Sequence, residues 1–296
     1  MANTLKHTPD SITSGSTINF FQVGNFVKRT FFGAIFVIIL IAGIIIHPIA
    51  FFAVFLGITL LGNYEFYKLI QKANCIPQII PGLISTTLLF IACFTYAYFN
   101  STILFALFVL STVLIPIIEL YRKKENPFGN IAYTFMGLIY VALPFSLLSF
   151  LVFPFGDQKF HWEILMGVFV MIWANDTGAY LVGVNFGKHR LFERISPKKS
   201  WEGSIGGAIA TLLIAWACSV LSSDLTMIQW FIAGIIVVIF GSFGDLVESL
   251  LKRSINIKDS GTILPGHGGV LDRFDAILLV SPMVFIFLQV INEFFH

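Results

Sequence analysis

No charged residue occurs over residues 30–64, which read TFFGAIFVIILIAGIIIHPIAFFAVFLGITLLGNY. A helix crosses a bilayer in about 20 residues, because each residue advances it by about 1.5 Å. The stretch is therefore long enough for two short spans, and the proline favours a break at His47–Pro48. A second uncharged stretch, residues 73–118, fits two more spans with a turn near residues 98–101. The two stretches together predict an all-α, polytopic membrane protein.

The composition supports this fold class. Hydrophobic residues make up 57% of the chain and charged residues 11%, with a mean hydropathy of +0.87. Soluble domains carry about 25% charged residues, so this chain cannot cover itself with a solvated surface. The net charge of +2 is too small to indicate nucleic-acid binding. Cys75, Cys93 and Cys218 form no Cys-x-x-Cys pair, so neither a disulfide framework nor a zinc site is indicated.

Five further apolar stretches lie near residues 128–153, 162–184, 203–222, 227–251 and 274–293, which brings the expected count to about nine spans. With nine spans and a cytoplasmic N-terminus, every Lys and Arg except Lys159 falls in cytoplasmic segments or at cytoplasmic span ends. This asymmetry is the one that the positive-inside rule requires. We predict this topology, in a bacterial inner membrane, with the functional site facing the cytoplasm.

The same topology divides the chain into two parts. Residues 1–29 are polar and are predicted to form a disordered cytoplasmic tail, and residues 30–296 form a single membrane domain. Glu119 and the basic residues 122–124 are expected to lie in a solvated cytoplasmic loop. Nothing repeats at a fixed period, so no division within the membrane domain is indicated.

The densest cluster of polar residues lies in residues 249–275, SLLKRSINIKDSGTILPGHGGVLDRFD. Asp272 and Asp275 would share one helical face and could hold a divalent cation. Residues 265–269 form a glycine-rich turn whose backbone N–H groups could cradle an anion. Charged donors for phosphate are Lys252, Arg253, Lys258 and Arg273. A basic loop that only anchors to lipid head groups would explain the cations but not the paired aspartates or the turn.

This segment resembles the signature of the CDP-diacylglycerol synthases (phosphatidate cytidylyltransferases), with every characteristic position filled. The resemblance covers mainly residues 170–280. It implies an enzyme of phospholipid biosynthesis that transfers the cytidylyl group of CTP to phosphatidic acid, giving CDP-diacylglycerol and pyrophosphate. The residue chemistry agrees, because a phosphate monoester is already anionic at pH 7 and needs no general base, only charge neutralisation and in-line positioning.

Two shorter motifs precede the signature and resemble further blocks of the family. In NDTGAY, residues 175–180, Asp176 lies within a span and needs a partner, although the small residues also suit close helix packing. In SPKKSWEG, residues 196–203, Ser196 and Pro197 are predicted to begin a helix, which would place Lys198 and Lys199 near its N-terminus as phosphate ligands. The alternative for the lysine pair is an ordinary basic flank of a span.

A last motif, GDLVES, occupies residues 244–249. Asp245, Glu248 and Ser249 share a helical face, and Lys252 continues that face one turn later. Asp245 is expected to supply a facing carboxylate for the metal, while a purely structural salt bridge to Lys252 remains the alternative.

The predicted site follows from these motifs. Catalytic residues are Asp245, Asp272, Lys258, Arg273 and His267, and phosphate-binding residues are Lys198, Lys199, Lys252, Arg253, Gly268 and Gly269. The metal ligands are Asp245, Asp272 and Asp275 with Asp176 as a fourth, holding Mg²⁺, and a second or monovalent ion is left open. His267 either bonds phosphate or maintains the turn. The expected partners are CTP, phosphatidic acid and the lipid bilayer, and a homodimer is left open.

Two other functions fit parts of this pattern. A CTP-dependent lipid-alcohol (polyprenol-type) kinase would share the metal site but transfer the γ-phosphoryl group and release CDP. An ion-coupled transporter would use intramembrane carboxylates as coupling sites, with matched broken helices in two halves. The sequence shows no such internal symmetry, and its motifs gather on the cytoplasmic side.

Overall fold

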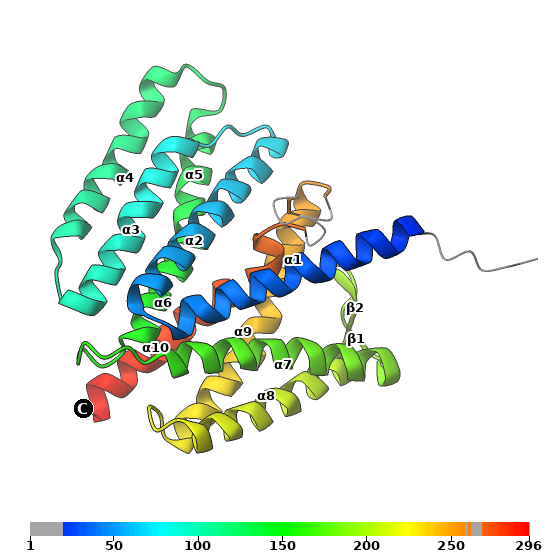
Figure 1. Ribbon diagram of the computed structural model, residues 1–296. Helices are drawn as coiled ribbons and strands as arrows, with labels where there is room; N and C mark the ends of the chain where they lie inside the picture. Colours follow the sequence, from blue (N-terminus) through cyan, green and yellow to red (C-terminus); the bar gives the residue numbers. More distant parts are fainter. Residues whose placement is uncertain (1–19, 258–259, 262–267, 296) are drawn as a thin grey trace, which may run out of the picture.

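The computed structural model describes residues 20–257, 260–261 and 268–295 and is almost entirely helical (Figure 1). The α-helices are α1 (Phe20–Ile45), α2 (Pro48–Ile70), α3 (Ile79–Phe99), α4 (Ile103–Arg122), α5 (Pro127–Gly137), α6 (Leu143–Val152), α7 (Trp162–Phe186), α8 (Trp201–Leu221), α9 (Met227–Ser254) and α10 (Leu271–Phe295). A 3-10 turn, Gln71–Ala73, follows α2, and a π-helical segment, Leu138–Ala142, joins α5 to α6. The all-α membrane fold is confirmed, with one small addition: strands β1 (Arg190–Phe192) and β2 (Ser196–Ser200) form an antiparallel hairpin.

Eight helical segments of the described chain are long and apolar enough to cross a membrane. They run from Pro48–Ala73 to Leu271–Phe294, with α5, the π-helical segment and α6 counted as one, Pro127–Val152. α1 contributes a shorter apolar stretch, Gly33–Ile45. The chain is thus a polytopic membrane protein, while the count of nine spans and the cytoplasmic N-terminus stay predictions. α1 begins at Phe20 and so includes residues 20–29 of the predicted tail, while residues 1–19 lie outside the described residues.

Helix boundaries fall where proline and asparagine predict them. α1 ends at Ile45 and α2 begins at Pro48, and His47 caps the new helix because its Nδ1 accepts a hydrogen bond from Ile49 N at 3.1 Å. α3 ends before Asn100, which adopts a left-handed conformation. Pro144 lies just after the π-helical segment. Since proline cannot donate to the preceding turn and its ring crowds that turn's carbonyl, the wider π turn accommodates it.

The prediction for Glu119 was wrong, because its side chain is buried between α3, α4 and α5. Glu119 Oε2 accepts from Gln78 Nε2 and from Arg122 Nη1, both at 2.6 Å, and Oε1 accepts from Asn130 Nδ2 at 2.9 Å. A buried carboxylate is tolerated when its oxygens are paired and hydrogen-bonded, as they are here. Glu119 therefore joins three helices in a part of the fold away from the motifs.

Ser196 does not begin a helix, contrary to prediction. Residues 196–200 pair with β1 as strand β2, and α8 begins at Trp201 with Ser200 as its N-cap, the Ser200 hydroxyl accepting from Gly203 N at 3.2 Å. Both serines suit an N-cap, but only Ser200 stands directly before the first helical turn. Lys198 and Lys199 consequently lie on a hairpin strand beside the end of α7 (Figure 1).

α9 and α10 approach each other closely at Gly244. A Cβ atom at this position would lie 2.9 Å from the Ala276 Cα atom and would also overlap the Asp275 carbonyl. Only glycine allows the two backbones to meet here, as at the small-residue contacts of membrane helices. The contact places the residue after Gly244, Asp245, beside the first turns of α10.

Candidate functional site

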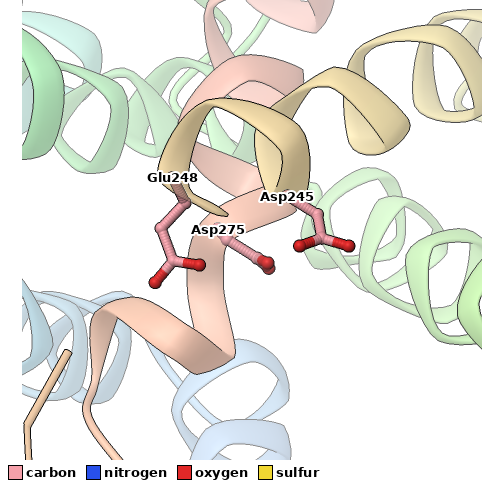
Figure 2. Close-up of side chains that lie close together, drawn as sticks. All are labelled: Asp245, Glu248 and Asp275. Atoms are coloured by element: carbon pink, nitrogen blue, oxygen red, sulfur yellow. The ribbon is translucent and has the colours of Figure 1, made fainter. Parts of the chain in front are cut away.

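Three carboxylates converge where α9 crosses α10. Asp245 and Glu248 lie one turn apart on α9, and Asp275 projects from α10 toward them (Figure 2). One oxygen from each residue lies within 4.8 Å of one from each of the others. Carboxylate oxygens at this spacing are ligands suited to a hard divalent cation. We call these three residues the carboxylate cluster.

Glu248 is the buried member of the cluster, with 1% of its surface exposed. Its Oε2 forms an ion pair with Lys252 Nζ at 2.6 Å, yet within the described chain neither oxygen has a hydrogen-bond partner of regular geometry. Buried carboxylate oxygens left in this state are costly unless a cation or further donors reach them. The geometry of the cluster thus fits a metal ion. Glu248 is a further ligand candidate: the sequence predicted the helical face on which it lies, but not a role as a metal ligand.

Asp272 is not part of this group among the described residues. Lys252 Nζ donates to its Oδ1 at 2.7 Å, and its Oδ2 accepts from Ser260 N and from Gly269 N, both at 3.0 Å. Three donors occupy the carboxylate, while the Ser260 hydroxyl lies 2.9 Å from Oδ2 but directs its single proton to Glu65. In this arrangement Asp272 binds the backbone just before α10 and pairs with Lys252, and its role as a metal ligand stays a prediction.

The backbone N–H groups of the glycine-rich turn are also partly occupied. Gly268 has a φ of +83°, a conformation that favours glycine, and the N–H of Gly269 donates to Asp272. The next N–H, of Val270, donates to Glu65 Oε2 at 2.7 Å. Within the described part of the turn, the N–H of Gly269, which was expected to help cradle an anion, therefore binds a carboxylate, and so does the N–H of Val270 directly after the turn. Lys258 and His267 lie outside the described residues.

The hairpin brings a lysine to the cluster. Lys199 Nζ lies 2.7 Å from Asp245 Oδ2 and donates to the Ser242 carbonyl at 3.3 Å. Lys198 is exposed on the same strand. Arg253, by contrast, is exposed at the end of α9 and donates to the Ile257 carbonyl at 3.4 Å.

Two cavities meet at the carboxylates. The hairpin cavity, about 350 Å³, lies between α7, β2, α8 and α9, and its polar lining includes Asn175, Tyr180, Ser196, Lys198, Lys199 and Ser204. The α1 cavity, about 420 Å³, is lined by aromatic, aliphatic and charged side chains, and its lining includes Phe36, Leu40, Phe169, Trp173, Arg273 and Asp275. Asp176, Gly241 and Asp245 line both cavities. A polar ligand and an amphipathic ligand could therefore reach the same carboxylates from two sides.

Two residues that lie at this site were not predicted from the sequence. Glu65 of α2 is buried against Ser260 and Val270, and a charge inside an apolar helix was the signal that could have identified it. Tyr140 lies on the π-helical segment, within electrostatic reach of Glu248 and Asp275. Its buried hydroxyl has no hydrogen-bond partner within the described chain. No sequence pattern predicted the π turn that presents it.

Comparisons with known proteins identify the family of this chain. A sequence model of the cytidylyltransferase family matches residues 27–291. A protein of Staphylococcus saprophyticus named phosphatidate cytidylyltransferase is 33% identical over 256 residues, 85% of this chain and 92% of that protein. A Bacillus subtilis protein of the same name is 32% identical over 242 residues, 78% of this chain and 87% of that protein. A Staphylococcus aureus protein of that name is 39% identical over 168 residues, 56% of this chain and 62% of that protein.

Proposed function

This chain belongs to the cytidylyltransferase family, and from that premise we propose that it transfers the cytidylyl group of CTP to phosphatidic acid, releasing pyrophosphate. The observation that carries the proposal is the meeting of a lysine-lined cavity and a cavity with aromatic walls at Asp176 and Asp245. Each cavity suits one substrate of this reaction. The relatives named phosphatidate cytidylyltransferase support the choice of lipid.

The nucleophile is a phosphate oxygen of the lipid. It attacks the α-phosphorus of CTP, a new P–O bond forms, and the bond from the α-phosphorus to the bridging oxygen of the β-phosphate breaks. The lipid phosphate is anionic at neutral pH, so no side chain has to remove a proton. The protein's task is to hold two anions in line and to stabilise the negative charge that develops on pyrophosphate.

CTP occupies the hairpin cavity in this proposal. Lys198 and Lys199 line it and contribute charged donors for the triphosphate. Lys199 already pairs with Asp245, so it can exchange this carboxylate for a phosphate oxygen when the nucleotide and its cation arrive. Asp176 borders the same space and is the further carboxylate candidate.

Phosphatidic acid occupies the α1 cavity. Its acyl chains lie against the aromatic side chains, including Phe36 and Trp173, and its phosphate lies beside Arg273, which also lines the cavity. An arginine guanidinium can bind a phosphate with two parallel hydrogen bonds, which fixes orientation as well as charge. An apolar wall on α1 suits entry of the lipid from the bilayer.

The carboxylate cluster would hold Mg²⁺, with Asp245, Glu248 and Asp275 as its protein ligands. When bound, the cation would neutralise negative charge on the triphosphate. Lys252 stays between Glu248 and Asp272 and keeps the first turns of α10 against α9. The positive-inside asymmetry supports a site on the cytoplasmic face of the inner membrane, where CTP is present.

Purified protein, Mg²⁺ and phosphatidic acid test the proposal with two labelled nucleotides. Label at the α-phosphorus of CTP should appear in the lipid, and label at the γ-phosphorus should appear in pyrophosphate. A CTP-dependent lipid kinase would give the opposite pattern with a lipid alcohol, placing γ-label in the lipid and releasing CDP. If α-label never enters the lipid phase, the proposed function is wrong.

A further inference from the structure

We propose that Glu65 is a positioning residue for the transfer reaction. From α2 it binds Ser260 and Val270 of the signature segment and thereby fixes the first turns of α10. This inference rests on the proposed function, because the residues that it positions are Asp272, Arg273 and Asp275. Glu65 is distant from the signature in sequence and belongs to none of the motifs.

The contacts of Glu65 reach residues on both sides of the loop. Its Oε2 accepts the N–H of Val270 at 2.7 Å, and its Oε1 accepts the hydroxyl of Ser260. Glu65, Ser260 and Val270 are 3%, 5% and 2% exposed, so water does not compete for these bonds. One carboxylate therefore binds a residue on each side of residues 262–267, Ser260 before them and Val270 after them.

Asp272 also binds residues before and after residues 262–267, namely Ser260 and Gly269. Its Oδ2 accepts the N–H groups of Ser260 and Gly269, so Glu65 and Asp272 together occupy two successive N–H groups, those of Gly269 and Val270. The N–H groups before a helix have no intrahelical partner, and carboxylates there also interact favourably with the helix dipole. The start of α10 is thus fixed by one carboxylate of its own and one supplied by α2.

The packing around Gly269 shows how closely the loop fits Glu65. A Cβ atom at Gly269 would overlap the Glu65 carboxylate and the Ser260 hydroxyl, and one at Gly261 would lie 2.9 Å from Glu65 Cδ. Any side chain at Gly269 would push the loop away from α2. The closeness of Glu65 therefore explains why a glycine is needed at position 269.

α2 itself is held rigidly on both sides of Glu65. Asn63 Nδ2 donates to Thr86 Oγ1 at 2.5 Å, and Tyr67 OH donates to the Thr134 carbonyl at 2.9 Å. These buried bonds tie α2 to α3 and α5, so Glu65 is presented from a fixed support. A group that orients reacting residues works best when its own position is fixed in this way.

Glu119 provides a matched control. It is also a buried helical carboxylate with hydrogen bonds to other helices, but its partners are Gln78, Arg122 and Asn130, none of which belongs to the site. The comparison separates positioning of α10 from the general cost of altering a buried carboxylate.

The experiment compares E65Q with E119Q in the full-length protein. Glutamine retains one acceptor oxygen and turns its NH₂ group toward the other donor, so one of the two bonds of Glu65 is lost. Hydrogen–deuterium exchange without substrate or Mg²⁺ should become faster in peptides covering residues 268–274 for E65Q and remain unchanged there for E119Q. In the lipid-labelling assay, kcat of E65Q should fall at least about tenfold with KM for CTP within about threefold, because binding groups persist while alignment is lost.

The outcomes separate the two proposals. With an active parent, three outcomes would each overturn the inference. They are a normal kcat for E65Q, an unchanged exchange rate at residues 268–274 in E65Q, and an equal loss of activity per folded protein in E65Q and E119Q. An inactive parent would refute the proposed function instead, and the exchange measurement would still decide whether Glu65 holds the loop. If E65Q does not insert, S260A replaces it, since it removes the hydroxyl contact and leaves the Val270 contact in place.

Discussion

Lys199 Nζ and Asp245 Oδ2 lie 2.7 Å apart, and this ion pair joins the β-hairpin to α9 at the point shared by the two cavities. The lysine and the carboxylate come from different motifs. Each is only partly exposed, so the pair is less screened than a surface ion pair. A nucleotide in the hairpin cavity, as proposed, would replace or share this contact, which would link its binding to the proposed cation at the cluster.

Replacing both Lys198 and Lys199 by glutamine should lower kcat/KM for CTP at least about tenfold, because each charge-assisted phosphate contact contributes about 1.5–3 kcal/mol. The lipid-labelling assay measures this effect per amount of inserted protein. The same double change at Lys123 and Lys124, which lie after α4 and outside every motif, should be nearly silent. Equal losses from the two pairs would mean that general surface charge, not phosphate binding, explains the effect.

Glu248→Gln should raise the Mg²⁺ concentration for half-maximal activity by about tenfold or more, because it removes an anionic ligand of the cluster. High Mg²⁺ should restore much of the rate. Direct titration with Mn²⁺, followed by electron paramagnetic resonance, should show weaker binding without substrate. Glu125→Gln, at an exposed position after α4, supplies the control. Unchanged Mn²⁺ affinity would exclude Glu248 as a ligand.

Asp272→Asn should also lower turnover, by at least about tenfold, but for a different reason. The amide loses the ion pair with Lys252 and places a donor against Ser260 or Gly269. Since these contacts fix α10 and do not bind the cation, excess Mg²⁺ should not restore activity. Rescue by high Mg²⁺ would return Asp272 to the metal ligands predicted from the sequence.

Gly244→Ala should damage both folding and activity. The added methyl group would meet the α10 backbone at Asp275 and Ala276, so α9 and α10 would have to separate, at a cost of about 1–3 kcal/mol. Gly57→Ala is the matched control, because a Cβ atom there has nothing within 4 Å. It should be neutral or stabilise α2 slightly, by about 0.5–1 kcal/mol. Thermal unfolding in detergent measures both variants, and similar midpoints would refute the close contact.

Single cysteines can test the predicted topology. In a background without Cys75, Cys93 and Cys218, a cysteine at Ser196 of the hairpin should resist a membrane-impermeant thiol reagent in intact cells. A cysteine at Gln158, in the turn before α7, should be labelled readily. The expectation rests on the distribution of Lys and Arg residues. The reverse labelling pattern would place the site on the side of the membrane without CTP.

Much of the fold follows from short-range features of the sequence. Long uncharged stretches predicted the membrane helices, because an apolar segment of sufficient length satisfies its backbone only as a helix in lipid. Pro48 predicted the break between α1 and α2 for an equally local reason. The choice of N-cap was the local exception, since two serines preceded α8 and strand pairing with β1 decided in favour of Ser200.

The site itself depended on which helix faces meet. From the sequence, Asp245, Asp272 and Asp275 were equivalent carboxylates on two helices, and Glu65 was only a charge at the end of an apolar stretch. The contact at Gly244 brings Asp245 and Glu248 to Asp275, while Ser260 and Gly269 engage Asp272. Helical periodicity fixes which residues share a face but not which face of another helix packs against it. The sequence thus determined the spans and the kind of chemistry, and only the tertiary structure decided which carboxylates form the cluster and which hold the backbone.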